Sequence, residues 1–293
     1  MANGLTIRPS VEGLELDPQA LAALRDAYGK MQQLSATDNR SWIYWAGVHG
    51  FSQFMCWHHG RVGSGGDTRP YNLFLPWHRA YLLHFEHAAR DQNNGARLPW
   101  WDWTSSGAHK RGIPKSFSAP KVGNERNTLH DGPMPPMPPD PARNTVRFPG
   151  RPADLPTAAQ VNSLLSATSF ADFNVQIEDI HDQVHGWGGG LNPSPPPEGG
   201  DMGVIATAAY DPIFWAHHCM IDRLWYLWQL RHGVSNIPPD YLDMPLAPFA
   251  VTVQDVLDIN RLGYEYAQSS THPSAPGTPS GGGDVTHGTG KHH

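Results

Sequence analysis

The stretch DPIFWAHHCMIDRLWYLWQL, residues 211–230, predicts a long helix with a well-defined start. Asp211 can accept hydrogen bonds from the first free amides of a helix, and Pro212 loses no hydrogen bond at the first helical position. Large side chains then recur at spacings of four and three and share one buried face: Phe214, His218, Ile221, Trp225 and Trp228. A buried histidine needs partners for its ring nitrogens, because an unsatisfied polar group in the interior costs about 1–3 kcal/mol. A metal ion is one such partner.

Three more stretches have helical periodicity, and each places histidine on or beside its apolar face. They are residues 41–50, 75–91 and 170–184, and their histidines are His49, His78 and His181, followed one turn later by His185. A single buried histidine is usually a hydrogen-bonded core residue, whereas histidines on the buried faces of four helices together indicate a site. A further helix at residues 18–34 contains no histidine and is expected to be structural.

The composition excludes several classes of function. The chain of 293 residues has 21 Lys and Arg, a formal net charge of −6 and no basic run, so we expect no nucleic-acid partner. It has no 18-residue apolar run and no N-terminal signal pattern. We therefore expect no membrane span and a cytoplasmic location, unless a partner protein exports the chain. The two cysteines are too few for a disulfide scaffold, and the 17 histidines are the unusual feature.

We expect a single domain at residues 1–267. Within it, residues 105–156 contain PMPPMPPDP and little periodicity, which predicts a long surface excursion with short extended pieces. The Gly- and Pro-rich residues 186–200 predict a loop. Residues 268–293 consist mainly of Ser, Pro, Gly, Thr and His, which predicts a disordered tail.

The pair His181-x-x-x-His185 is the sharpest metal signal. Histidines four residues apart lie on one helical face and can bind one ion, with His218 as the third ligand. Such all-imidazole sites suit Zn, Cu, Fe or Ni. HDQVH also resembles the HExxH motif of zinc hydrolases, but Asp182 is one methylene shorter than Glu and would reach a zinc-bound water poorly. The chain also offers two sets of three histidines, whereas such a hydrolase needs one.

Five motifs in this order resemble the central domain of tyrosinases and catechol oxidases, the type 3 copper proteins: GVHG (47–50), FLPWHR (74–79), LPWWDW (98–103), HDQVHGWGGG (181–190) and DPIFWAHHCMIDRLW (211–225). The resemblance covers about residues 8–266. It implies a mainly α fold, a four-helix bundle that houses a dinuclear copper site, with long irregular loops and few short strands. It also implies two copper ions, each bound by three histidines, and O2 as co-substrate.

By this resemblance, the second copper ion is bound by His181, His185 and His218. The family uses the second histidine of the His-His pair, which selects His218 and leaves His217 beside the site. For the first copper ion, His49 matches the GIHG-type histidine of the family and His78 matches its WHR histidine.

The remaining ligand of the first copper ion is harder to assign. Arg69 stands where the family usually has this histidine, and it cannot bind copper. Cys56-Trp57-His58 resembles the Cys-x-His of fungal tyrosinases and molluscan haemocyanins, in which the sulfur is bonded to the ligand ring. The resemblance therefore assigns His58, with a Cys56–His58 thioether, and His59 is the alternative.

The function implied is oxidation of o-diphenols to o-quinones, with hydroxylation of monophenols as a second activity. Hydroxylation needs a base, because a phenol has a pKa of about 10 in water. In the family, a Glu before the HxxxH motif and an Asn after its first histidine hold a water that takes this proton. Glu178 matches this Glu. Asp182 stands where the family has the Asn, and three roles are open for it: a better base, a protonated mimic of Asn, or a solvated charge.

Phe214 is expected to pack over the site, and Ile205 lies near the substrate-selecting loop of the family. Structural roles are expected for Asp102, Asp222 and Arg223.

Three alternative functions remain open: an O2 carrier of the haemocyanin kind, an o-aminophenol oxidase and a mononuclear zinc hydrolase. Carriers place a further domain over the copper site, and this sequence ends in its tail soon after Tyr266, which favours an enzyme open to small phenolic substrates. A zinc hydrolase leaves His49, His58 and His78 without a role. An o-aminophenol oxidase would use the same site. A helper protein that delivers copper is a candidate partner, and the oligomeric state is not predicted.

Overall fold

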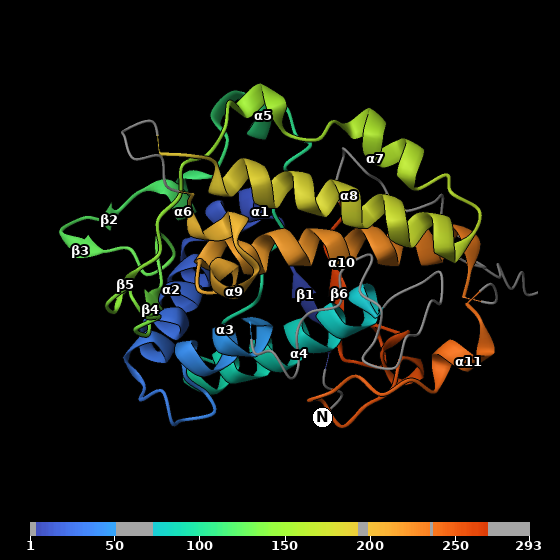
Figure 1. The fold of residues 1–293 in the computed structure, drawn as a ribbon, viewed down its shortest axis with the longest axis horizontal. Helices are drawn as coiled ribbons and strands as arrows, with labels where there is room; N and C mark the ends of the chain where they lie inside the picture. Colours follow the sequence, from blue (N-terminus) through green and yellow to red (C-terminus); the bar gives the residue numbers. More distant parts are fainter. Residues whose placement is uncertain (1–3, 51–72, 193–198, 235–236, 269–293) are drawn as a thin grey trace, which may run out of the picture.

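The computed structural model describes residues 4–50, 73–192, 199–234 and 237–268 (Figure 1). Five long helices form its frame: α2 (Pro18–Gln33), α3 (Trp42–Gly50), α4 (Phe74–Gln92), α8 (Phe170–Gly189) and α10 (Pro212–His232). Four of them match the predicted helices at 18–34, 41–50, 75–91 and 211–230 to within two residues at each end. The predicted mainly helical fold is confirmed.

The helix α10 begins as its sequence predicts. The side chain of Asp211 accepts a hydrogen bond from the backbone N–H of Ile213 over 3.1 Å, and Pro212 is the first helical residue. Gly233, with φ of 72°, ends the helix. α10 contacts α4 and α8, and α4 also contacts α8, so these three helices pack against one another (Figure 1).

The helix α8 is longer than predicted. We expected it to end near Val184 and the GWGGG segment to be a loop, but the helix continues to Gly189. A Cβ atom on Gly189 would lie 2.4 Å from the backbone nitrogen of Gly203, so the glycine permits a close backbone contact. The glycines of this segment therefore allow the helix to pack closely against its neighbour. The helix ends only at Gly190, which has a φ of 55°.

Short elements connect the long helices. The helical ones are α1 (Val11–Glu15), α5 (Ala108–Arg111), α6 (Lys115–Ser118), α7 (Ala158–Leu164), α9 (Ile205–Ala208) and α11 (Pro239–Leu242), with the 3-10 turns η1 (Pro152–Asp154), η2 (Asp201–Gly203) and η3 (Gln254–Val256). Two small antiparallel pairs lie in the predicted excursion: β2 (Lys121–Val122) with β3 (Glu125–Arg126), and β4 (Pro133–Met134) with β5 (Arg143–Asn144). The sequence prediction of short extended pieces in this segment is thus met.

Two strands that are far apart in the sequence lie side by side. β1 (Thr6–Arg8) pairs in parallel with β6 (Tyr264–Tyr266), with Thr6 opposite Tyr264. The sequence left residues 249–266 unassigned, because a strand of three residues has too little periodicity to detect. Among the described residues, no helix is both long and apolar enough to cross a membrane.

The core of the molecule is aromatic. Eight tryptophans are at most 1% exposed: Trp42, Trp77, Trp100, Trp101, Trp103, Trp215, Trp225 and Trp228. Large rigid rings bury much apolar area at low entropic cost, so they hold the helices in fixed positions around the histidines.

Candidate metal centre

Five of the six predicted copper ligands lie among the described residues. His49 comes from α3, His78 from α4, His181 and His185 from α8, and His218 from α10. All but His185, which is partly buried, are at most 2% exposed. The sixth predicted ligand, His58, lies outside the described residues, as do Cys56 and the alternative ligand His59.

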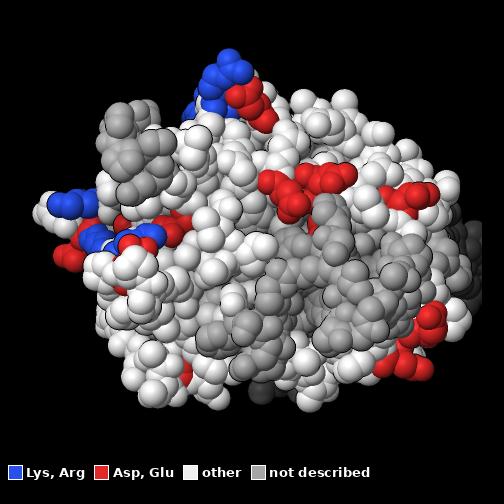
Figure 2. Space-filling view, viewed as in Figure 1, with Lys and Arg blue, Asp and Glu red and all other residues white. Residues whose placement is uncertain are grey.

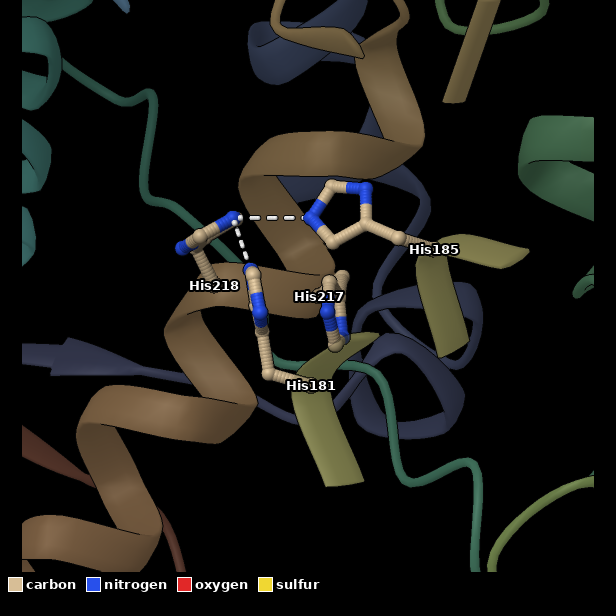
Figure 3. Close-up of side chains that lie close together, drawn as sticks. All are labelled: His181, His185, His217 and His218. Carbon is tan, nitrogen blue, oxygen red and sulfur yellow. Dashed lines mark hydrogen bonds between the residues drawn. The ribbon is translucent and has the colours of Figure 1, made fainter. Parts of the chain in front are cut away.

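Three ring nitrogens converge on one point between α8 and α10 (Figure 3). Nε2 of His218 lies 3.2 Å from Nε2 of His181 and 3.2 Å from Nε2 of His185. Imidazole nitrogens bound at about 2.0–2.1 Å around a tetrahedral ion lie about 3.3 Å apart. These three histidines, the α8–α10 cluster, therefore have a spacing that fits one metal ion.

Hydrogen bonds at the opposite ring nitrogen determine which nitrogen faces this point. Nδ1 of His185 donates to the carbonyl oxygen of Met202 over 2.7 Å, and Nδ1 of His181 lies 2.9 Å from Oδ1 of Asp182. A carbonyl and a carboxylate only accept hydrogen bonds, so both Nδ1 atoms carry the proton of the neutral ring. The Nε2 lone pairs of His181 and His185 consequently point toward each other and toward His218, an arrangement that a cation stabilises.

The histidines of α3 and α4 are oriented in the same way. Nδ1 of His49 donates to the carbonyl oxygen of Ile205 over 2.9 Å, and Nδ1 of His78 donates to that of Phe74 over 2.8 Å. His49, His78 and His218 each place a ring nitrogen within 4.8 Å of the other two, and we name them the α3–α4 cluster. The ring of His218 stacks on that of His78 at a centroid distance of 4.4 Å. His218 thus stands between two adjoining sets of donors.

His217 is buried beside the α8–α10 cluster. Its ring stacks on the ring of His181, with centroids 5.2 Å apart and planes inclined by 15° (Figure 3). Burial and the neighbouring His185 hold the pKa of His217 well below its ordinary value, and burial and the surrounding histidines do the same for His218. Both rings are therefore neutral, as metal binding requires. One nitrogen of His217 also lies within 4.8 Å of the donors of the cluster, so distance alone does not exclude it as a ligand.

Two phenylalanines pack against the histidines of the clusters. Phe214 is completely buried and packs against His218 at 4.1 Å and against His49 at 4.8 Å between ring centroids, as its predicted place over the site requires. Phe74, which the sequence analysis missed, packs against His78 and His181 at 4.7 Å each. It precedes His78 by four residues, just as Phe214 precedes His218. This repeated Phe-x-x-x-His spacing was the available signal.

The two predicted carboxylates lie in different environments. Glu178 is completely buried, one turn before His181 on α8. The side chain of Asp182 is 49% exposed, and its Oδ1 accepts a hydrogen bond from His181. This contact was not predicted, and it gives Asp182 a role in orienting a metal ligand. Figure 2 shows acidic side chains gathered over α8, where Asp172, Asp179 and Asp182 are exposed.

A cavity of about 330 Å³ lies beside the histidines. It is lined by His49, His181, Asp182, His185, Gly186, Met202, Gly203, Ile205 and Ala208. The η2 turn and α9 form one of its walls, and the residue Ile205 is 42% exposed there. Ile205 thus both lines the cavity and holds His49, whereas the sequence placed it only near the substrate-selecting loop.

The charged residues expected to be structural are buried away from this cavity. Asp102, Asp222 and Arg223 are at most 3% exposed. Asp222 accepts hydrogen bonds from the hydroxyl groups of Tyr264 over 2.7 Å and Tyr266 over 2.6 Å. These contacts attach β6 to α10, one turn beyond His218.

Comparison with known proteins agrees with this geometry. The family model described as the common central domain of tyrosinase matches residues 39–231. A tyrosinase of Streptomyces galbus is 32% identical over 214 residues, which cover 63% of this chain and 73% of the relative. A haemocyanin of Sepia officinalis, units G and H, is 28% identical over 272 residues, which cover 83% of this chain but 42% of the relative. The chain spans less than half the length of the first haemocyanin relatives that it matches.

The solved structures include a similar fold. A tyrosinase from Burkholderia thailandensis superposes with a TM-score of 0.77 at 24% identity, covering 93% of this chain and 76% of the other. At this identity the likeness shows a shared fold.

Proposed function

Since the chain belongs to the tyrosinase family and has its dicopper domain, we propose that it is an oxidase that converts o-diphenols to o-quinones with O2 and also hydroxylates monophenols. The observation that carries this proposal is the pair of adjoining histidine clusters at the wall of a cavity. Family members include both tyrosinases and haemocyanins, so the assignment of an enzyme rests on the cavity and its residues.

The described residues supply all three proposed ligands of one ion and two of the three proposed for the other. His181, His185 and His218 would bind the second copper ion, and His49 and His78 would bind the first together with His58. Two copper ions, when bound, supply the two-electron exchange between O2 and a catechol. The protein orients four of these five rings, because three donate Nδ1–H to backbone carbonyl oxygens and His181 donates to the carboxylate of Asp182.

The surroundings of the clusters favour redox chemistry. Phe214 and Phe74 each contact a histidine of both clusters, and both are completely buried. Apolar rings at this place surround part of the donor set with a medium of low polarity, which strengthens electrostatic interactions within the site.

The cavity supports an enzyme in preference to an O2 carrier. Its volume of about 330 Å³ is in the range of small-molecule pockets and accommodates one phenolic ring. It is lined by His49, His181 and His185, so a ring placed there would lie against both clusters. Asp182 lines the same cavity, and its charge disfavours carboxylated phenols relative to neutral or cationic ones.

Monophenol hydroxylation needs a proton acceptor close to the bound phenol. Glu178, buried one turn before His181, is the base that we propose, and Asp182 would help to hold the water that relays the proton. The same residues would serve an o-aminophenol oxidase, which oxidises another ring at the same site. A zinc hydrolase would use one cluster and leave the other without a role.

Oxygen uptake with a simple catechol tests the proposal. The metal-free chain is loaded in parallel with Cu and with Zn, and its metal content is measured. We expect rapid uptake from the copper form with two ions per chain, none from the zinc form, and loss of uptake in His218→Ala and His49→Ala. His87→Ala, which removes an exposed histidine of α4, is the matched control and should retain uptake. A chain that binds two copper ions without consuming O2 would favour the carrier, and a chain that binds a single ion would overturn the dicopper assignment.

A further inference from the structure

One short loop orients a histidine in each cluster. The carbonyl oxygen of Met202, in η2, accepts the Nδ1–H of His185, and the carbonyl oxygen of Ile205, at the start of α9, accepts that of His49. The two acceptors are three residues apart in sequence, whereas the histidines belong to α8 and α3. A shift of this loop would therefore turn one ring of the α8–α10 cluster and one ring of the α3–α4 cluster together.

An ion pair holds this loop in place. Asp201, the first residue of η2, is 3% exposed and accepts two parallel hydrogen bonds from Arg143 of β5, over 2.7 and 2.8 Å. Asp201 also accepts a hydrogen bond from the backbone N–H of Val146 over 2.7 Å and donates its own N–H to the carbonyl of Val146 over 2.9 Å. Bidentate pairs between arginine and carboxylate fix both distance and direction. The loop is thus attached to the excursion at residues 105–156. Its position does not depend only on hydrogen bonds within its own backbone.

Inside the loop, further contacts carry this restraint to the acceptors. The hydroxyl of Thr207 donates to the carbonyl of Asp201 over 3.0 Å, which connects α9 to η2. The backbone N–H of Val204 donates to the same carbonyl over 3.1 Å. On its other side, the loop packs so closely on α8 that residue 189 must be glycine. Asp201, Met202 and Ile205 are therefore restrained together, by the pair with Arg143 on one side and by the close contact with α8 on the other.

We propose that Arg143 and Asp201 form a latch that sets the orientation of both metal clusters through this shared loop. Neither residue is a metal ligand, so both are positioning residues. The proposal rests on the proposed function, because it assumes that the two clusters bind metal ions. The latch also has an effect on the substrate, because Met202, Gly203 and Ile205 form the cavity wall.

Metal binding of latch variants tests the proposal. Copper(I) is titrated anaerobically into the metal-free chain in competition with a chromophoric chelator, so that both binding steps are measured. We expect Arg143→Gln and Asp201→Asn to weaken both steps about ten- to a hundred-fold, as loss of groups that orient metal ligands does. Arg143→Lys keeps the charge but not the parallel hydrogen bonds, and should lose less.

A matched control separates the latch from a general loss of ion pairs. Arg151 forms a similar two-bond pair with Asp154, over 2.9 and 2.9 Å, in the same excursion but without contact to the loop. Arg151→Gln should leave both copper affinities within about two-fold of the original. Unchanged affinities in Arg143→Gln and Asp201→Asn, or weakening of a single step in both, would overturn the shared latch.

A second measurement needs no metal and separates this proposal from the proposed function. Amide hydrogen exchange of the metal-free chain should be at least ten-fold faster at Val204, Thr207 and Ala208 in Arg143→Lys and Arg143→Gln, and unchanged in α2. Unaltered exchange in these amides would show that the pair does not hold the loop. If the original chain binds fewer than two copper ions but the Arg143 variants still exchange these amides faster, the proposed dicopper function is wrong. The proposed restraint of the loop by Arg143 and Asp201 is then still supported.

Discussion

Glu178 is a carboxylate without solvent contact, one turn from a metal ligand. Its position places a proton-accepting group beside the α8–α10 cluster. If Glu178 takes the phenol proton, Glu178→Gln should lower monophenol hydroxylation about 10²-fold or more, in the range of general-base catalysis. Catechol oxidation should stay within a few-fold. Initial rates of oxygen uptake with a monophenol and with a catechol, on one copper-loaded preparation, give the ratio.

The control for this change is an exposed acid. Glu125→Gln alters a surface residue of β3 and should leave both rates unchanged. Equal losses of both activities in Glu178→Gln would mean that the residue supports the fold or the metal, and its role as a base would be excluded.

The adjacent residues His217 and His218 offer a test within one helical turn. Both are buried and neutral, but only His218 directs Nε2 at two other ligands. Among the described residues, neither ring nitrogen of His217 has a hydrogen-bond partner. Replacing such a group by an apolar one is close to neutral, so His217→Leu should retain folding and two copper ions per chain. His218→Leu should fold but bind at most one ion.

Metal content and the midpoint of thermal unfolding distinguish these outcomes. The two variants have the same substitution at neighbouring positions, so a general effect of leucine in α10 would appear in both. Loss of an ion in His217→Leu with two ions kept in His218→Leu would reverse the assignment of ligands.

At the scale of elements, the start of each long helix was predictable, because capping and periodicity are local. Asp211 with Pro212 determines the start of α10, and the Phe-x-x-x-His spacing places a phenylalanine one turn before His78 and before His218. The end of α8 was not predictable, because its glycines allow a close backbone contact with η2, and no periodic pattern in the sequence marks such a contact.

The acceptors that orient the histidines were also beyond sequence analysis. Met202, Ile205 and Phe74 act through backbone carbonyls, which every residue has, so no side-chain pattern marks them. Arg143 and Asp201 are 58 residues apart, and no periodicity joins them. His58 was assigned by resemblance alone and stays a prediction.

A buried charge network joins the strands β1 and β6 to the helices α4 and α10 of the site. Burial opposes ionisation of Asp222, but Arg79 and then Arg8 outweigh it and hold the pKa of Asp222 below its ordinary value. The unfolded value is about 3.9, so the charged carboxylate contributes stability that is complete above about pH 4. This contribution is lost as the pH falls through the lower folded pKa.

Asp222→Asn should therefore lower the free energy of unfolding by about 3–5 kcal/mol at pH 7, because it leaves buried arginines without their counter-charge. The difference from the original chain should shrink below about pH 4. Denaturant unfolding at pH 7 and near pH 3 measures it. Asp26→Asn, which breaks an exposed pair with Lys30, is the control and should cost at most about 1 kcal/mol. A deficit in Asp222→Asn that is the same at both pH values would contradict a role for the charge.

At the scale of the whole molecule, the clusters join four helices that the chain supplies from distant segments. α3, α4, α8 and α10 each provide at least one ligand, and the backbone acceptors come from a fifth segment, at η2 and α9. A metal ion bound here connects elements across the whole core. The donors converge only in the folded chain, so an ion bound to all of them stabilises the folded state.

Removal of metal should thus destabilise the entire domain. An ion present at a hundred times its dissociation constant adds about 2.7 kcal/mol to the free energy of unfolding. For a domain of this size, that corresponds to a rise in the unfolding midpoint of about 5–10 °C. Calorimetry of the copper-loaded and the chelator-treated chain measures this shift. Zn exchanges no electrons with O2, and it should also raise the unfolding midpoint.

The variant His218→Leu decides whether the shift arises at the clusters. His218 belongs to both sets of donors, so its loss should remove more than half of the stabilisation by either metal, while the unfolding midpoint of the metal-free form stays within a few degrees of the original. Equal stabilisation of the original chain and the variant would mean that the ions bind to other histidines of the chain. The dicopper centre would then have no part in holding the four helices together.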